Sequence, residues 1–294
     1  MQRQTLFGIF GTVLLSSACS LSVGTMGTPT PVDQVGTIVA MTMQAITGTP
    51  SGNVSTPIPN QSGGIPVSYE NVSFVIPSGM ASAADTVTMT SVDTNSGAPW
   101  EIAPTHLRFT LMGYQLQGKF FEPQIYVYPA DEYAQVNSLA SEQIERLKRA
   151  LAGSPLLKET LPNVPFFNAE HIIAANIQLI KFQSGSGVRE LTQYDQYPAP
   201  INNHELFYHF EGLTSDGKYY IIAILPIRAP ILAEDEKPES SVPTGGIPVP
   251  PNTGPTDVYY FSVTEKLNSL TLDSFSPPLN ALDSLIQSIL VKNP

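Results

Sequence analysis

The chain contains one cysteine, Cys19, in 294 residues. A disulfide needs two thiols, and structural zinc sites draw on several cysteine or histidine ligands. Cys19 lies where an apolar run gives way to small residues, a position at which we expect its thiol to be modified. The sequence therefore excludes a disulfide framework and a cysteine nucleophile, and the fold must be held together by packing alone.

Basic residues are also scarce. Lysine and arginine total 14 against 25 aspartates and glutamates, which gives a formal net charge of -11, and no basic cluster interrupts this balance. Such a chain repels phosphate backbones and anionic lipid headgroups. We therefore expect no nucleic acid among its partners and no electrostatic adhesion to membranes.

The first apolar run, Leu6–Leu15, is too short to cross a bilayer. As a helix it would span about 15 Å, roughly half of a bilayer core. Arg3 precedes the run, and the small residues Ser16, Ser17 and Ala18 follow it, which is the arrangement of a secretory signal peptide. The sequence predicts a signal peptide over residues 1–18.

The residues around the predicted cleavage site carry a further signal. Leu15, Ser17, Ala18 and Cys19 resemble the bacterial lipobox, although Ser16 stands where the usual leucine is found. The resemblance implies that Cys19 is acylated and anchors the protein to the cell membrane or outer membrane, facing outside the cytoplasm. An ordinary secreted protein is the alternative.

Residues 20–64 are rich in Gly, Ser, Thr and Pro and contain no lysine, arginine, glutamate or aromatic residue. Too little apolar surface is available for an independent fold, so residues 19–64 are predicted to be a flexible tether with lipidated Cys19 at its start. Apolar residues at spacings of three and four predict a short helix near 33–47. This helix would dock on the main domain, fray in solution or bind a partner. Asp33 is its only charge, which argues against a membrane-surface role.

Residues 65–294 are predicted to form a single α+β domain. Short β-branched and aromatic runs at 71–77, 86–92, 106–114 and 123–129 indicate strands, and the three-to-four spacing over 131–151 indicates a helix. We expect Asp131 to cap this helix, Gly153 to end it, and Asn137-Ser138 to interrupt it at most briefly.

The middle of the chain predicts an antiparallel meander. Turn residues at 183–187 and 214–218 each separate two strand-like runs, so two hairpins should place four strands side by side, with Ser-Gly and Asp-Gly supplying positive backbone angles. The run 218–227 is apolar at odd and even positions, as expected of a central strand. A Pro-rich acidic loop is expected at 228–256.

Two helices are predicted at the C-terminal end, the second with Ser276 as N-cap and Pro277 at its first position. The fold class is therefore α+β: an antiparallel meander with helices packed on it.

The segments "SGVRELTQY", "INNHELFYHFEGLTSDGKYY" and "SPPLNALDSLIQSIL" resemble a family of bacterial lipoproteins and secreted proteins with no assigned activity. The strand "VSFVIPSG", the meander and the last helix also resemble the PsbP/Mog1-type sandwich, which implies a non-enzymatic interaction module.

Candidate chemistry is sparse. His204 and His209 in "HELFYH" are five residues apart, whereas the zincin motif needs four, so we expect no zinc there. His106 and His171 lack partners at ligand spacing and are expected at the surface or partly packed. The sequence offers no catalytic residue, metal site or cofactor motif, the acidic run 234–236 is expected to be a solvated loop, and Trp100 a packing residue.

One polar surface stands out in the predicted meander. Arg189, Glu205, Phe207, His209 and Glu211 are hypothesised to share one exposed sheet face that binds a protein or a glycan. The preferred function is a non-enzymatic binding or scaffolding module. A hydrolase that uses paired carboxylates on glycans or peptides is the alternative, and two carboxylates converging about 5 to 10 Å apart in one deep pocket would favour it.

Overall fold

The structure is a computed structural model that describes residues 53–54, 63–237, 239–251 and 253–293. The predicted signal peptide, Cys19 and the predicted helix near 33–47 lie outside the described residues. No helix within those ranges combines the length and the apolar character needed to cross a membrane.

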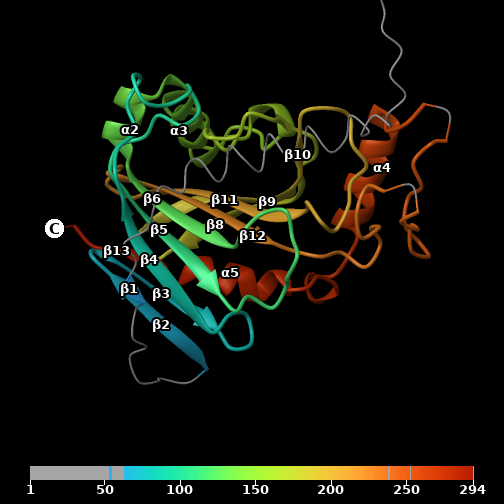
Figure 1. Cartoon of the computed structure of the whole chain (residues 1–294), viewed down its shortest axis with the longest axis horizontal. Helices are drawn as coiled ribbons and strands as arrows, with labels where there is room; N and C mark the ends of the chain where they lie inside the picture. Colours follow the sequence, from blue (N-terminus) through green and yellow to red (C-terminus); the bar gives the residue numbers. More distant parts are fainter. Residues whose placement is uncertain (1–52, 55–62, 238, 252, 294) are drawn as a thin grey trace, which may run out of the picture.

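The architecture is α+β, as the sequence predicts, and an antiparallel sheet of eight strands forms its centre (Figure 1). In spatial order the strands are β1 (Asn53–Val54), β4 (Ala83–Met89), β5 (His106–Met112), β6 (Gln124–Pro129), β12 (Tyr219–Pro226), β11 (Phe207–Thr214), β9 (Gly185–Thr192) and β8 (Ala175–Phe182). The four-strand meander predicted from the two hairpins is the run β12-β11-β9-β8.

Both faces of this sheet are covered. Helices α2 (Ala130–Val136) and α3 (Ser138–Leu151) lie on one face; on the other lie helix α5 (Leu279–Gln287) and a small sheet of β13 (Leu290–Val291), β3 (Val72–Pro77) and β2 (Gly64–Tyr69) (Figure 1). Helix α4 (Asp257–Asn268) contacts β8 at one end. Two strands of two residues, β7 (Glu170–His171) and β10 (Tyr194–Asp195), pair near that end, and η1 (Lys158–Thr160) and η2 (Leu272–Ser274) are short 3-10 turns.

Strand β12 shows why the sheet has two apolar cores. Ile222 and Ile224 pack in the core beneath α2 and α3, while Ile221 and Leu225 pack in the core shared with α5. All four are fully buried, because successive side chains of a strand point to opposite faces and both faces are covered here. The prediction of a central strand at 218–227 is confirmed.

The helix boundaries differ from the predictions in two places. Asn137 divides the predicted helix 131–151, and its side chain accepts hydrogen bonds from the first backbone N–H groups of α3; Pro129, not Asp131, precedes α2. Ser276 does not cap the last helix, because its backbone pairs with Arg228 and α5 starts three residues later, after Pro278. A local cap at Asn137 therefore set the first boundary, and the tertiary pairing of Ser276 with Arg228 set the second.

The first hairpin uses its glycines differently from the prediction. Neither Gly185 nor Gly187 has a positive φ. A Cβ on Gly187 would lie 2.2 Å from the Glu211 carbonyl oxygen and 2.5 Å from the Phe210 ring. This glycine therefore allows close approach of an aromatic ring to the sheet, whereas Gly217 in the second hairpin does supply the expected positive φ, 75°.

Candidate functional site

The predicted binding face lies inside the protein. Phe207, His209 and Glu211 share one face of β11, but that face packs under α3, and the three residues are at most 2% exposed. The sequence correctly placed these three side chains together. The prediction that they form an exposed surface was wrong, because a helix covers this side of the sheet.

The other two members of the predicted face lie elsewhere. Arg189 is paired with Phe210 across β9 and β11, so it points to the opposite face, where its guanidinium is 3.7 Å from Asp283 of α5. Glu205 precedes β11 in a turn and accepts hydrogen bonds from Gln193 and Asn202. The register of the two strands, which the sequence did not reveal, separates Arg189 from His209.

A buried ion network replaces the predicted surface. His209 lies between two carboxylates: its Nδ1 is 3.0 Å from Glu190 Oε1 and its Nε2 is 3.1 Å from Glu211 Oε1. His171 adds a contact of 3.2 Å to Glu190 Oε2, and Tyr220 donates to Glu211. The expectation that His171 is a surface or partly packed residue was wrong, since it is 6% exposed.

Electrostatics within this network favour a charged His209. Burial alone would lower the pKa of His209, but its hydrogen bonds to Glu190 and Glu211 outweigh that effect and raise the pKa to about 9. For Glu190, burial would raise the pKa, but His171 and His209 lower it. The contact of Glu190 with His209 joins β9 to β11 inside the protein.

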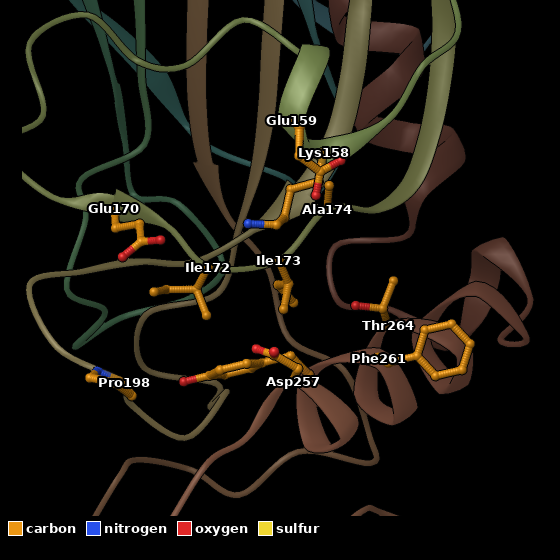
Figure 2. Close-up of a pocket in the computed structure, with 11 residues that line it drawn as sticks. Lys158, Glu159, Glu170, Ile172, Ile173, Ala174, Pro198, Asp257, Phe261 and Thr264 are labelled. Atoms are coloured by element: carbon orange, nitrogen blue, oxygen red, sulfur yellow. The ribbon is translucent and has the colours of Figure 1, made fainter.

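A groove of about 570 Å³ lies beside α4 (Figure 2). Ile172 and Ile173 form its floor between β7 and β8, Lys158 lies above them on η1, and Phe261 and Thr264 of α4 line the other side. The walls are held by two hydrogen bonds. Lys158 Nζ donates to the His171 carbonyl oxygen at 3.1 Å, and the Tyr260 hydroxyl donates to the Ala199 carbonyl oxygen at 3.0 Å.

The groove is acidic and partly apolar. Three carboxylates, Glu159, Glu170 and Asp257, line it together with the single lysine. Phe261 of α4, which lines the groove, is 67% exposed, and Val258, three positions earlier on the same helix, is 75% exposed; they are the two most exposed of the large apolar side chains described. Exposed apolar anchors beside a groove are typical of sites that contact another molecule.

Next to this groove lies a cluster of carboxylates, of which Asp195 is buried and Glu205 and Glu236 are half-buried. Gln193 Nε2 donates both to Asp195 Oδ2 at 2.7 Å and to Glu205 Oε2 at 2.9 Å, and Tyr197 donates to Glu236. Burial raises the pKa of Asp195, and burial together with the neighbouring Asp195 raises the pKa of Glu205. The prediction that the run 234–236 is solvated holds for Glu234 alone, since Asp235 and Glu236 are half-buried.

These carboxylates do not converge on one pocket. Asp195 lines an open hollow of about 510 Å³, and Glu236 lines a separate hollow of about 630 Å³ beside the Pro-rich loop. No hollow described here is lined by both. Asp195 and Glu236 thus line different hollows, whereas a glycosidase-like site has two facing carboxylates in one pocket.

His171 and His209 share Glu190, whereas His106 and His204 contact other groups. His204 lies in the turn before β11 with its Nδ1 3.0 Å from the Gly118 carbonyl oxygen, whereas His209 is in the core. His106 is 5% exposed, so its expected surface location was also wrong. Within the described ranges, no three His, Cys, Asp or Glu side chains are grouped so as to hold a metal ion.

Comparisons with protein-family models, curated proteins and solved structures found no match for the chain. The likenesses to bacterial lipoproteins and to the PsbP/Mog1-type sandwich therefore stay predictions from sequence.

The sequence analysis did not identify several residues that form the ion network or lie at and beside the groove. Glu190 follows Arg189 directly in an otherwise apolar strand, and adjacent opposite charges in a buried strand require separate partners on its two faces. The adjacent residues Arg189 and Glu190 could therefore have indicated two buried ion pairs from the sequence. Asp195 and Glu170 are brought opposite each other only by the pairing of β7 with β10, for which the sequence carries no periodic signal.

Proposed function

We propose that the protein is an extracytoplasmic lipoprotein, anchored through Cys19, whose α4 groove binds a protein segment carrying apolar and basic side chains. The exposed pair Val258 and Phe261 is the observation that carries this proposal. The two residues are three positions apart, so they lie on the same side of α4. Exposure of both apolar side chains to water is unfavourable in free energy. A partner with apolar side chains would bury them.

The charge of the groove indicates the rest of the partner's chemistry. None of the ion pairs in the described part of the chain engages Glu159, Glu170 or Asp257. Their charges are therefore available to basic groups of a ligand. Lysine or arginine side chains beside the partner's apolar anchors would complement this surface and speed its encounter.

Peptide binding tests the groove directly. Two fluorescent twelve-residue peptides, one alternating leucine with lysine and the other leucine with glutamate, are titrated with the full-length protein in a neutral detergent. Anisotropy should rise for the lysine peptide, and the response should weaken at least tenfold in the double variant Val258→Ser, Phe261→Ser. Met112→Ser removes an apolar side chain that is 49% exposed on β5 and serves as the control. Equal binding of both peptides, or an unchanged double variant, would contradict the proposal.

The anchor requires a separate experiment. Cells grown with a fatty-acid probe should label the wild-type protein and leave Cys19→Ser unlabelled. Equal labelling of the two proteins would show that Cys19 is not the attachment site, without affecting the groove.

A hydrolase is the second candidate, supported by the shared donor of Asp195 and Glu205. If these carboxyls perform acid–base chemistry, glycoside or peptide substrates should be cleaved by the wild type and spared by Asp195→Asn and Glu205→Gln. Cleavage that persists in both variants would exclude them as the acting groups.

A further inference from the structure

A smaller pocket of about 90 Å³ lies on the α2 and α3 side of the sheet, remote in sequence from the α4 groove. Its lining is largely aromatic and comes from β4, β5, β6, α2, the segment that follows β4 and the loop between η1 and β7. The principal side chains are Met89, Trp100, His106, Tyr128, Tyr133 and Phe166. Exposed Thr90 and half-buried Trp100 and Glu101 lie at its outer part.

His106 presents a fixed, unsatisfied acceptor in this lining. Its ring stacks on Tyr128 with centroids 4.3 Å apart, and Tyr128 stacks in turn on Tyr133 at 4.2 Å. Nδ1 is 2.8 Å from the Pro104 carbonyl oxygen, which only accepts, so Nδ1 carries the proton. Burial and the nearby Arg108 lower the pKa of His106 to about 4. Nε2 is therefore a lone-pair acceptor at neutral pH, and this buried atom has no hydrogen-bond partner among the described residues.

Trp100 presents a donor to the same space. Its indole N–H is buried and has no partner in the described part of the chain. The segment that carries Trp100 is held in place from both sides, because Asn137 Nδ2 donates to the carbonyl oxygens of Pro99 at 3.1 Å and Ile102 at 2.8 Å. The side chain that caps α3 thus also fixes the wall of the pocket.

Arg108 supplies a positive charge beside the pocket. It lies two residues beyond His106 on β5, hence on the same face of the strand, and is 5% exposed. No carboxylate within the described ranges forms an ion pair with it, and its buried Nε and Nη1 atoms have no hydrogen-bond partner. The one carboxylate in the lining, Glu101, accepts instead from the Ala98 N–H at 2.7 Å. A buried guanidinium without a counter-ion is costly and calls for an anion.

We propose that this pocket binds a small hydroxycarboxylate, whose carboxylate is held by Arg108 and Trp100 and whose hydroxyl donates to His106 Nε2. The size of the pocket limits the ligand, since an engineered apolar cavity of about 150 Å³ holds benzene and this pocket is smaller. A carboxylate of two to four carbons fits the smaller volume. The aromatic walls exclude water from the charge pair and so strengthen it.

Trp100 is the only tryptophan in the chain, so its fluorescence reports on this pocket alone. The full-length protein in neutral detergent is titrated with lactate, propionate, lactamide and inorganic phosphate at constant ionic strength. Lactate should change the emission in a saturable way and bind more tightly than propionate, which lacks the hydroxyl. Lactamide, which lacks the charge, should bind at least tenfold more weakly than lactate.

Variants separate the roles of the two side chains. Arg108→Met should weaken lactate binding at least tenfold, while Arg228→Met, which removes a half-exposed arginine of the Glu234 ion pair, should leave it unchanged. His106→Phe preserves the ring stack and should abolish the preference for lactate over propionate. Circular dichroism identifies any variant that fails to fold. In that case, the relative affinities of the wild-type protein for the four ligands test the proposal. Absence of saturable binding, equal binding of lactamide, or binding of phosphate alone would overturn the proposal.

Discussion

Glu190 and His209 lie directly opposite each other on β9 and β11, with Glu190 Oε1 3.0 Å from His209 Nδ1, both at most 2% exposed. This pair ties two central strands together beneath α3. Because neither group reaches water, each depends on the other for the interactions that water would otherwise provide.

Removing His209 should therefore destabilise the protein strongly near neutral pH. His209→Leu leaves Glu190 and Glu211 buried without their shared cation, and we expect a loss of about 3–5 kcal/mol in the free energy of unfolding. Urea denaturation at pH 7 measures the change. His204→Leu, in the turn before β11, is the control and should cost far less; equal losses would argue against the network as the cause.

The same network predicts how stability depends on pH. The pKa of His209 is raised to about 9 from its ordinary value of 6.5, so the folded state binds this proton more tightly than the unfolded chain does. Its contribution is complete below about pH 6.5 and is lost as the pH rises through 9. The stability gap between wild type and His209→Leu should narrow between pH 7 and pH 10, and a constant gap would contradict the assigned charge.

Ionisation of Asp195 should destabilise the folded protein, whereas the charge on His209 stabilises it. Burial raises its pKa above the ordinary value of 3.8, so the folded state resists ionisation of this carboxyl and loses stability as the pH rises above that value. Asp195→Asn keeps an acceptor for Gln193 and removes the charge. We expect it to be more stable than wild type by about 1–3 kcal/mol at pH 9 and nearly equal to it at pH 4, in thermal unfolding at both pH values. A destabilised variant at pH 9 would refute this prediction.

The ion pair between Arg189 and Asp283 connects the sheet to α5 and gives a further test. Asp283 Oδ1 lies 3.7 Å from Arg189 Nε and also accepts from the Tyr208 hydroxyl at 2.9 Å. Asp283→Ala should cost about 3–5 kcal/mol because it leaves the buried guanidinium uncompensated. Asp273→Ala, at an exposed position on η2, should change the free energy of unfolding by less than about 0.5 kcal/mol. Chemical denaturation of both variants provides the comparison.

Gly187 offers a test of packing rather than charge. A Cβ at this position would lie 2.2 Å from the Glu211 carbonyl oxygen, a backbone atom that cannot move aside without disturbing β11. We expect Gly187→Ala to destabilise the protein by about 1–3 kcal/mol, as overpacking of a core does. Ser186→Ala, one residue earlier on β9, is the matched control, and a Gly187→Ala variant as stable as that control would show that the sheet adapts.

Most element types could be predicted from local sequence patterns, because periodicity depends only on how side chains alternate along a strand or helix. The strands at 106–114, 123–129 and 218–227, the two hairpins and the class α+β all follow from local pattern and turn residues. The same alternation predicts that Phe207, His209 and Glu211 lie on one face of β11.

The contacts of those faces, in contrast, follow from how the elements pack in three dimensions. The register of β9 against β11 placed Glu190, and not Arg189, beside His209, and α3 buried the face that sequence reasoning left open to solvent. The groove beside α4 and the pocket of His106 and Trp100 bring together segments far apart in the chain. Such long-range contacts depend on how whole helices and strands pack together. Many residues along the chain determine that packing jointly, so no single position or short segment reveals it.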